Sequence, residues 1–154
     1  MEVINMKILL TGHKGFIGSH LLNKLRKKHS VVGIDLQDGQ DLHDIELNEE
    51  FDLIIHLAGK SGVRESISDP AGYWRNNVEV SKRLFARYPD TRVLYASSSS
   101  AYEPDLNPYA ASKYVMEEAA ERYPNTLGMR FHTVYSDVPR KGMFLQKLID
   151  GELE

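Results

Sequence analysis

A tyrosine and a lysine stand four residues apart, at Tyr109 and Lys113, where a helical pattern begins. Side chains at this spacing share one face of a helix. An ammonium group stabilises a nearby tyrosinate, which can then act as a general base near neutral pH. The serine run at 97–100 precedes the pair, and a hydroxyl from it can hydrogen-bond the oxygen that loses its proton. The combination indicates proton abstraction from an alcohol.

Three glycines follow the apolar run Lys7–Thr11, at Gly12, Gly15 and Gly18, and a helical pattern begins among them. A strand, a glycine-rich turn and a helix start form the arrangement that cradles a dinucleotide pyrophosphate. The first glycine permits the turn, the second lets the backbone approach the phosphates, and the third allows close packing of helix on strand. The helix start offers unpaired N–H groups to the anion. The spacing differs by one glycine position from the common fingerprint, so a plain glycine-rich turn is the alternative.

An acidic residue ends the second predicted strand, at Asp35. It lies about 20 residues after the glycines, where a carboxylate accepts hydrogen bonds from the adenosine ribose hydroxyls. The negative charge repels a 2′-phosphate and therefore favours NAD over NADP. Lys14, within the glycine turn, could contact a 2′-phosphate and keeps NADP open. A solvated acid at a strand end is the alternative for Asp35.

The composition fits one globular domain over residues 1–154. A net charge of −3 gives no basic surface for nucleic acid. The chain has no cysteine, and its six histidines lack the spacing of metal ligands, so no metal site is expected. No apolar run reaches transmembrane length, and the first residues do not resemble a signal peptide. We therefore expect a cytoplasmic protein without a membrane partner.

Strand-like and helical patterns alternate along the chain, which predicts a doubly wound parallel α/β sheet of the Rossmann type, with five to six strands and helices on both faces. The predicted strands are Lys7–Thr11, Val31–Asp35, Leu53–Leu57, Arg92–Ala96 and Thr126–Arg130. The predicted helices are Phe16–Lys28, Ala71–Tyr88, Tyr109–Arg122 and Met143–Asp150. Any strand near Gln40–Leu42 must be very short, because too few residues precede it for a helical crossover. Ligands of such sheets lie beyond the carboxyl ends of the strands.

These motifs together resemble the extended short-chain dehydrogenase/reductases, the NAD-dependent epimerase/dehydratase family, from Lys7 to about Glu152. The run around Ser98 and the loop before Ile67 look most like UDP-glucuronate 4-epimerases, followed by UDP-glucose/galactose 4-epimerases. The matching segments are 11–18 (T-G-x-x-G-F-I-G), 41–42 (D-L), 56–59 (H-L-A-G), 62–67 (G-V-R-E-S-I), 76–78 (N-N-V) and 130–135 (R-F-H-T-V-Y).

The resemblance implies roles for individual residues. The catalytic set would be Ser98, Tyr109, Lys113 and Asn77, with Asn77 shaping a distortion of its helix. Lys113 would also hold the nicotinamide ribose. The cofactor-binding set would be Gly12, Lys14, Gly15, Phe16, Ile17, Gly18, Asp35, Asp41, Leu42, Leu57, Ala58, Gly59, Tyr109 and Lys113. His56 is expected to be a buried residue at a strand end.

The resemblance implies an NAD-dependent nucleotide-sugar 4-epimerase that works through a transient 4-keto sugar. The sugar 4,6-dehydratases carry an Asp-Glu pair where this chain has Ser99 and Ser100, so dehydration loses support. Two other functions stay open: a small NAD(P)-dependent dehydrogenase or reductase, and a non-catalytic dinucleotide-binding module.

The chain departs from the family in length. Family members are roughly twice as long, and their second half forms most of the sugar-nucleotide pocket. The chain is either a natural miniature or a piece of a longer protein, and the intact stretch from Gly12 to Lys113 favours a self-sufficient small enzyme.

The resemblance also implies a homodimer built on a four-helix bundle from Ala71–Tyr88 and Tyr109–Arg122. The apolar stripe expected to face the partner is Tyr73, Val80, Leu84, Tyr88, Val115 and Ala119.

Overall fold

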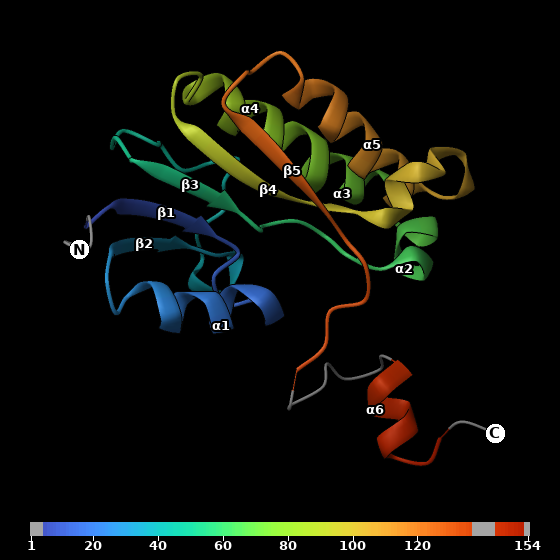
Figure 1. Ribbon diagram of the computed structural model, residues 1–154. Helices are drawn as coiled ribbons and strands as arrows, with labels where there is room; N and C mark the ends of the chain where they lie inside the picture. The colour runs from blue at the N-terminus through green and yellow to red at the C-terminus, as the bar shows by residue number, and fades with distance from the viewer. Residues whose placement is uncertain (1–4, 137–143, 153–154) are drawn as a thin grey trace.

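Five parallel strands form one sheet in the order β2-β1-β3-β4-β5 (Figure 1). The structure is a computed structural model that describes residues 5–136 and 144–152. The strands are β1 Lys7–Thr11, β2 Ser30–Ile34, β3 Leu53–His56, β4 Arg92–Ser98 and β5 Thr126–Phe131. The helices are α1 Phe16–Leu25, α2 Val63–Ser68, α3 Pro70–Trp74, α4 Val80–Arg87, α5 Pro108–Ala120 and α6 Phe144–Ile149. The predicted parallel α/β sheet is therefore confirmed.

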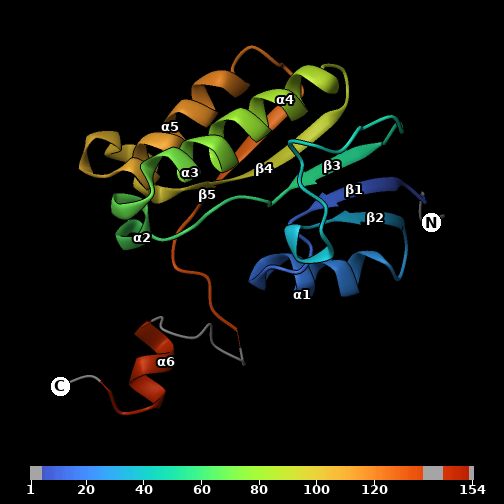
Figure 2. The ribbon, with the colours of Figure 1, turned by 180° about the vertical axis from the view of Figure 1, so that it is seen from behind.

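Helices cover both faces of the sheet, with α1 on one side and α3, α4 and α5 on the other (Figures 1 and 2). Successive strand residues point to opposite faces, so β1 feeds two apolar clusters. Ile8 and Leu10 pack with partly buried leucines of α1. Leu9 belongs to the larger cluster, which includes Leu84 of α4 and Met116 of α5. This two-sided burial explains why β1 is an uninterrupted apolar run.

The carboxyl ends of the strands lie in register at one edge of the sheet. Thr11 pairs with Ile34 of β2 on one side and with His56 of β3 on the other. β4 extends past its pairing with β3 because β5 continues beside it as far as Ser98 and Phe131. Ser98 is thus the last residue of a strand, whereas the sequence placed it just beyond one. The register brings the ends of all five strands to one side of the molecule.

A long connection without a strand joins β2 to β3. Residues 40–52 contain no strand. Arginine side chains of α4, instead of a ladder of hydrogen bonds to a neighbouring strand, hold this segment. The Arg83 guanidinium donates to the carbonyls of Leu42 (2.6 Å) and Ile45 (2.8 Å), and Arg87 Nε donates to the Leu47 carbonyl (2.6 Å). The backbone carbonyls of this segment therefore find hydrogen-bond donors although the segment does not join the sheet.

The helix predicted over Ala71–Tyr88 is interrupted. It consists of α3, a π-helical turn over Arg75–Glu79, and α4. π-Helical turns are rare and occur often at functional sites. The turn contains Asn77, where the resemblance implied a distortion. The short helix α2 before it was not predicted from the sequence.

The apolar stripe expected to face a second subunit lies mostly in the core of this chain. Tyr73, Val80, Leu84 and Tyr88 are at most 4% exposed, and Ala119 is 8% exposed. Helical spacing shows that residues share a face, but it does not say which neighbour that face meets. The choice of these residues as a partner surface was therefore wrong.

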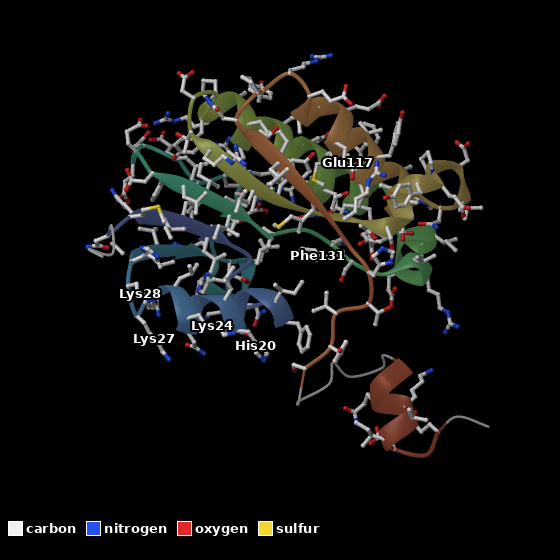
Figure 3. All side chains as sticks on the ribbon, viewed as in Figure 1. His20, Lys24, Lys27, Lys28, Glu117 and Phe131 are labelled. Carbon is white, nitrogen blue, oxygen red and sulfur yellow. The ribbon has the colours of Figure 1, made fainter. Side chains whose placement is uncertain are left out.

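The outer helix α5 is fastened to the edge strand β5 by an ion pair. Glu117 of α5, labelled in Figure 3, accepts hydrogen bonds from Nε (2.9 Å) and Nη2 (2.6 Å) of Arg130. This contact fixes the helix that carries Tyr109 and Lys113. None of the helices in the described ranges is long and apolar enough to cross a membrane.

Candidate functional site

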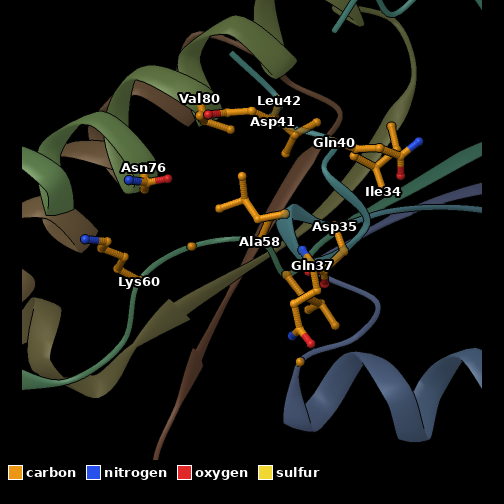
Figure 4. A pocket seen from close by; sticks show the side chains of 15 residues that line it. Ile34, Asp35, Gln37, Gln40, Asp41, Leu42, Ala58, Lys60, Asn76 and Val80 are labelled. Carbon is orange, nitrogen blue, oxygen red and sulfur yellow. Dashed lines mark hydrogen bonds between the residues drawn. The ribbon is translucent and has the colours of Figure 1, made fainter. Parts of the chain in front are cut away.

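A cavity of about 280 Å³ lies at the carboxyl ends of β1, β2 and β3 (Figure 4). Eight residues of the predicted cofactor-binding set line it: Gly12, Gly15, Asp35, Asp41, Leu42, Leu57, Ala58 and Gly59. Seven more line it that the sequence had not singled out for the cavity: Ile34, Leu36, Gln37, Gln40, Lys60, Asn76 and Val80. Four of them, Ile34, Leu36, Gln40 and Lys60, are direct chain neighbours of a predicted cofactor-binding residue, and that adjacency was the available signal.

The glycine turn has no room for side chains. Gly12 has φ +71°, and a Cβ there would lie 2.6 Å from the backbone nitrogen of Ala58. A Cβ at Gly18 would collide with the Gly12 carbonyl oxygen and lie 2.8 Å from the Cα of His13. Gly18 therefore packs against the turn itself, whereas close packing on the strand was expected.

The start of α1 is open toward the cavity. Gly15 is the N-cap residue and provides no side-chain capping bond, so the first N–H groups, at Phe16 and Ile17, are left for a ligand or water. The helix dipole adds a partial positive charge at this point. Phe16, Ile17 and Gly18 do not line the cavity with their side chains, so any role at this end belongs to their backbone.

The carboxylate of Asp35 is fixed at the cavity wall. Its Oδ2 accepts from the backbone nitrogen of Lys14 (2.8 Å) and its Oδ1 from that of Gln37 (2.9 Å). The residue is 8% exposed, so it is not a solvated acid at a strand end. Two backbone donors hold the carboxylate where the chain passes from β2 into the 3₁₀ turn Leu36–Asp38.

A second acid, Asp41, lines the same cavity. Its Oδ1 accepts from the His43 backbone nitrogen (2.9 Å), and its Oδ2 lies 3.2 Å from Nη2 of Arg75. The hydrogen bond from His43 lowers the pKa of Asp41, with a further contribution from Arg75. Asp41 is therefore charged at neutral pH.

Asn77 and Lys113 meet behind Gly59. The Asn77 side chain accepts from the Lys60 nitrogen (2.8 Å) and donates to the Lys60 carbonyl (3.0 Å) and to Ser112 Oγ (2.9 Å). A Cβ at Gly59 would lie 2.8 Å from Asn77 Oδ1 and 3.6 Å from Lys113 Nζ. The cavity therefore ends beside the buried ammonium of α5.

Lys113 is 6% exposed and donates to the Ala96 carbonyl (2.8 Å). Burial lowers the pKa of Lys113 to about 8, against an opposing effect of the Glu117 carboxylate. At pH 7 the group still carries most of its positive charge. A buried ammonium with a lowered pKa in such a position is a feature of functional sites.

Tyr109 and Ser98 do not line the 280 Å³ cavity. Tyr109 stands in the first turn of α5, where Asn107 caps the helix by accepting from Ala110 N (2.9 Å), and its ring packs edge-on against Tyr73. Ser98 Oγ accepts from the Ser100 nitrogen (3.2 Å). In the described part of the chain no hydrogen bond joins the Tyr109 hydroxyl to Ser98 or Lys113: Ser98 Oγ bonds the Ser100 nitrogen and Lys113 Nζ the Ala96 carbonyl.

A second cavity, of about 460 Å³, adjoins the end of β4. Its lining comes from α2, the turns after β4 and the cap of α5: Val63, Ser99, Ser100, Tyr102, Glu103, Leu106 and Asn107. It is therefore next to Ser98 in the chain and at the start of the helix that carries Tyr109.

A buried chain of hydrogen bonds runs from the glycine turn to Asn77. The Ser81 hydroxyl donates to the Asn77 carbonyl (2.7 Å), so it must accept from His56 Nε2 (2.9 Å). His56 is then the Nε2–H tautomer, and its Nδ1 accepts from the Thr11 hydroxyl (2.7 Å). Burial, with a smaller contribution from Lys113, lowers the pKa of His56 to about 3, so the ring is neutral. The expected burial of His56 is confirmed, and the link through Ser81 was not foreseen.

The sequence profile of the "NAD dependent epimerase/dehydratase family" matches residues 8–149. Protein CapI of Staphylococcus aureus is 31% identical over 92% of this chain and 58% of its own length. UDP-glucuronate 4-epimerase 1 of Arabidopsis thaliana is 28% identical over 96% of this chain and 48% of its own length.

Two solved structures are similar to this chain in both fold and sequence. MoeE5 in complex with UDP-glucuronic acid and NAD superposes with a TM-score of 0.82 and 31% identity, over 94% of this chain and 60% of that one. The UDP-glucuronic acid 4-epimerase from Bacillus cereus in complex with NAD has a TM-score of 0.81 and 28% identity, over 96% and 62% of the two chains. This chain thus spans about 60% of the length of these two structures and of Protein CapI, and about half of the Arabidopsis epimerase. The matched residues include the glycine turn, Asp35 and the Tyr109–Lys113 pair, and the chain belongs to the NAD-dependent epimerase/dehydratase family.

Proposed function

We propose that the chain binds NAD in the 280 Å³ cavity. The glycine turn, closed to any Cβ at Gly12, and the open start of α1 fit a pyrophosphate. Asp35 would accept from the adenosine ribose hydroxyls, and Asp41 and Leu42 would border the adenine. The negative charge of the Asp35 carboxylate disfavours a 2′-phosphate, so NAD is preferred over NADP. Similar structures hold NAD, which supports the assignment.

We further propose that the protein is a 4-epimerase of UDP-sugars, with UDP-glucuronate or UDP-glucose/galactose as substrate. Support comes from the relatives called UDP-glucuronate and UDP-glucose 4-epimerases. NAD, when bound, supplies a hydride acceptor that becomes the donor in the return step. The sugar is assigned to the side of Ser98 that carries the second cavity.

Within this proposal Tyr109 accepts the proton of the sugar C4 hydroxyl and returns it to the epimer. Ser98 donates a hydrogen bond to the same oxygen and holds it in place. Lys113 supplies a positive charge that favours the tyrosinate and contacts the nicotinamide ribose. Asn77 positions the Lys60 backbone beside Gly59 through three hydrogen bonds.

One observation carries the proposal: a buried ammonium, Lys113 Nζ, lies beside Gly59 where the cofactor cavity ends. The experiment is mass spectrometry of the purified chain after mild denaturation, followed by separation of the products from UDP-glucuronate, UDP-glucose and UDP-galactose. Released NAD and formation of a C4 epimer are the expected results. A chain that consumes NADH with a carbonyl substrate and forms no epimer would instead be a simple reductase.

A second candidate is a non-catalytic NAD-binding module. The observation that favours it is the partial length of the match, because the chain covers only about 60% of MoeE5 and of the Bacillus cereus epimerase. NAD binding without turnover of any sugar nucleotide would support this candidate.

Assembly and location complete the proposal: a cytoplasmic homodimer that packs α3–α4 and α5 of each copy into a four-helix bundle. The core residues named above are not available for it, but Trp74 and Tyr114 on these helices are 42% and 38% exposed. A dimer mass by light scattering that Tyr114→Arg reduces to a monomer mass is the expected result. A monomer mass for the unchanged chain at micromolar concentration would contradict the bundle.

A further inference from the structure

The carboxylate of Asp38 bridges two basic side chains of the glycine turn. Its Oδ2 lies 3.2 Å from His13 Nε2, and its Oδ1 forms an ion pair with Lys14 Nζ. Asp38 is the last residue of the 3₁₀ turn that begins just after Asp35. One acid thus ties this turn to the glycine turn, and both turns contribute residues to the lining of the cofactor cavity.

The bridge adjoins the predicted ribose site. Lys14 donates its backbone N–H to Asp35 Oδ2 (2.8 Å), so the lysine side chain starts beside the carboxylate assigned to the ribose hydroxyls. The ammonium of Lys14 is then directed to Asp38. A cation that a 2′-phosphate would need is therefore already engaged by a second carboxylate.

His13 holds Asp38 in this position. Its ring is 9% exposed and lies against Gly33 of β2, where an added Cβ would be 2.7 Å from Nδ1. The ring is wedged between strand and turn and presents Nε2 to Asp38. The Asp38 and Lys14 side chains are 34% and 41% exposed, so water and salt reach their ion pair.

We propose that Asp38 is a determinant of cofactor selectivity, in addition to Asp35, because it occupies the ammonium of Lys14. A phosphate monoester carries about −1.5 to −2 charges at pH 7. The 2′-phosphate of NADP would meet the charge of Asp35 and would have to displace Asp38 from Lys14. The ribose hydroxyls of NAD require neither. This inference rests on the proposed binding of NAD.

The test compares the dissociation constants of NAD and NADP for the full chain by titration calorimetry at low ionic strength, where screening is weakest. In Asp38→Asn the ratio of the NADP constant to the NAD constant is expected to fall at least threefold, because Lys14 becomes available to the phosphate. The same substitution with Lys14→Met added should return the ratio to within twofold of the unchanged chain. Asp90→Asn, an exposed acid before β4, controls for the change in net charge and should leave the ratio unaltered.

Three results would overturn the role of Asp38. These are an unaltered ratio in Asp38→Asn, a fallen ratio that persists without Lys14, and a fallen ratio in Asp90→Asn as well. Lys14→Met alone gives an independent check, because a rise of more than fivefold in the ratio would mean that Lys14 already serves NADP. Failure of the unchanged chain to bind NAD would contradict the proposed function instead, and with it the basis of this inference. Circular dichroism of each variant confirms that it is folded.

Discussion

The Nε2 atom of His56 lies 2.9 Å from the Ser81 hydroxyl, which in turn donates a hydrogen bond to the carbonyl of Asn77. The Thr11 hydroxyl donates to the other ring nitrogen of His56, Nδ1, at 2.7 Å. A neutral histidine thereby links β1, β3 and the π-helical turn, at the point where the cofactor cavity meets the helix of Lys113. The relationship matters because the ring is one of the hydrogen-bond partners of both buried hydroxyls, Thr11 and Ser81, and its removal leaves each of them one bond short.

Substitution of His56 should therefore lower stability. His56→Ala leaves the hydroxyls of Thr11 and Ser81 short of a partner, which costs at least about 2 kcal/mol in the free energy of unfolding. His20→Ala, on the exposed surface of α1 (Figure 3), should cost less than about 0.5 kcal/mol. Urea unfolding of the three proteins measures both values, and equal losses at the two histidines would contradict the role of the buried chain.

The same residue predicts a pH dependence. Its pKa is about 3 in the folded chain, below the ordinary value of about 6.5, so protonation favours the unfolded state. The stability that depends on neutral His56 is complete above about pH 6.5 and is lost as the pH falls toward 3, by at most about 1.4 kcal/mol per pH unit. The difference between the unchanged chain and His56→Gln, followed by urea unfolding between pH 7 and 4, should shrink as the pH falls. A difference that stays constant would show that His56 does not titrate in this way.

Two glycines with nearly the same backbone angle form a matched pair. Gly12 has φ +71° and Gly39 has φ +73°, but a Cβ at Gly12 would lie 2.6 Å from Ala58 N, whereas a Cβ at Gly39 would meet nothing within 4 Å. Gly39→Ala should cost about 1 kcal/mol for the left-handed conformation alone. Gly12→Ala should cost at least about 2 kcal/mol more and abolish NAD binding. Unfolding and calorimetry provide the two measurements, and similar effects at both sites would argue against a sterically closed turn.

Asp35→Ala should weaken NAD binding by about 1–3 kcal/mol, the cost of losing a charged hydrogen-bond acceptor. The structure adds that this carboxylate also accepts from Lys14 N and Gln37 N, so part of the loss reflects a loosened turn. Asp35→Asn retains an acceptor oxygen and should lose less. Calorimetry gives both affinities, and an unchanged affinity in Asp35→Ala would remove this residue from the site.

Much of the fold could be predicted because local signals agreed with the tertiary structure. β1 was predicted with the bounds that the structure shows, since its apolar run is buried on both faces and ends at a glycine. A sheet of five to six parallel strands was predicted, with at most a very short strand near Gln40–Leu42 because too few residues follow Asp35 for a helical crossover, and the structure has five strands. Gly12, Asp35 and Gly59 were expected at one edge because parallel strands bring their carboxyl ends together, whereas Asp41 was assigned from the family resemblance.

The remaining features depend on contacts between segments far apart in the chain. Nothing local marks Ser81 as the partner of His56, or Asp38 as the partner of Lys14, because those distances are set by packing. The stripe containing Val80 and Leu84 was assigned to the wrong neighbour for the same reason. A π-helical turn, too, leaves no periodicity of its own in so short a segment.

The lowered pKa of Lys113 predicts the pH above which activity declines. Burial lowers its pKa to about 8, so its ammonium loses the proton as the pH rises through that value, whereas an ordinary lysine stays charged to about pH 10. If the charge of Lys113 supports the tyrosinate of Tyr109, turnover should decline above about pH 8. Initial rates from pH 6 to 10 measure this, and a rate that still rises at pH 10 would show that the ammonium is not required. Lys113→Ala should lose turnover and also weaken NAD binding, since the residue is assigned two contacts.

The most direct measurement is the conversion of UDP-glucuronate, UDP-glucose and UDP-galactose to their C4 epimers by the unchanged chain and by Tyr109→Phe, each with its NAD affinity determined in parallel. We predict epimer formation by the unchanged chain and a loss of about 10²- to 10⁴-fold in Tyr109→Phe, with NAD affinity retained, because only the proton-accepting hydroxyl is removed. Ser98→Ala should lose less than Tyr109→Phe. Epimerisation that survives in Tyr109→Phe would contradict the assigned base, and NAD binding without conversion of any of the three sugars would contradict the epimerase itself.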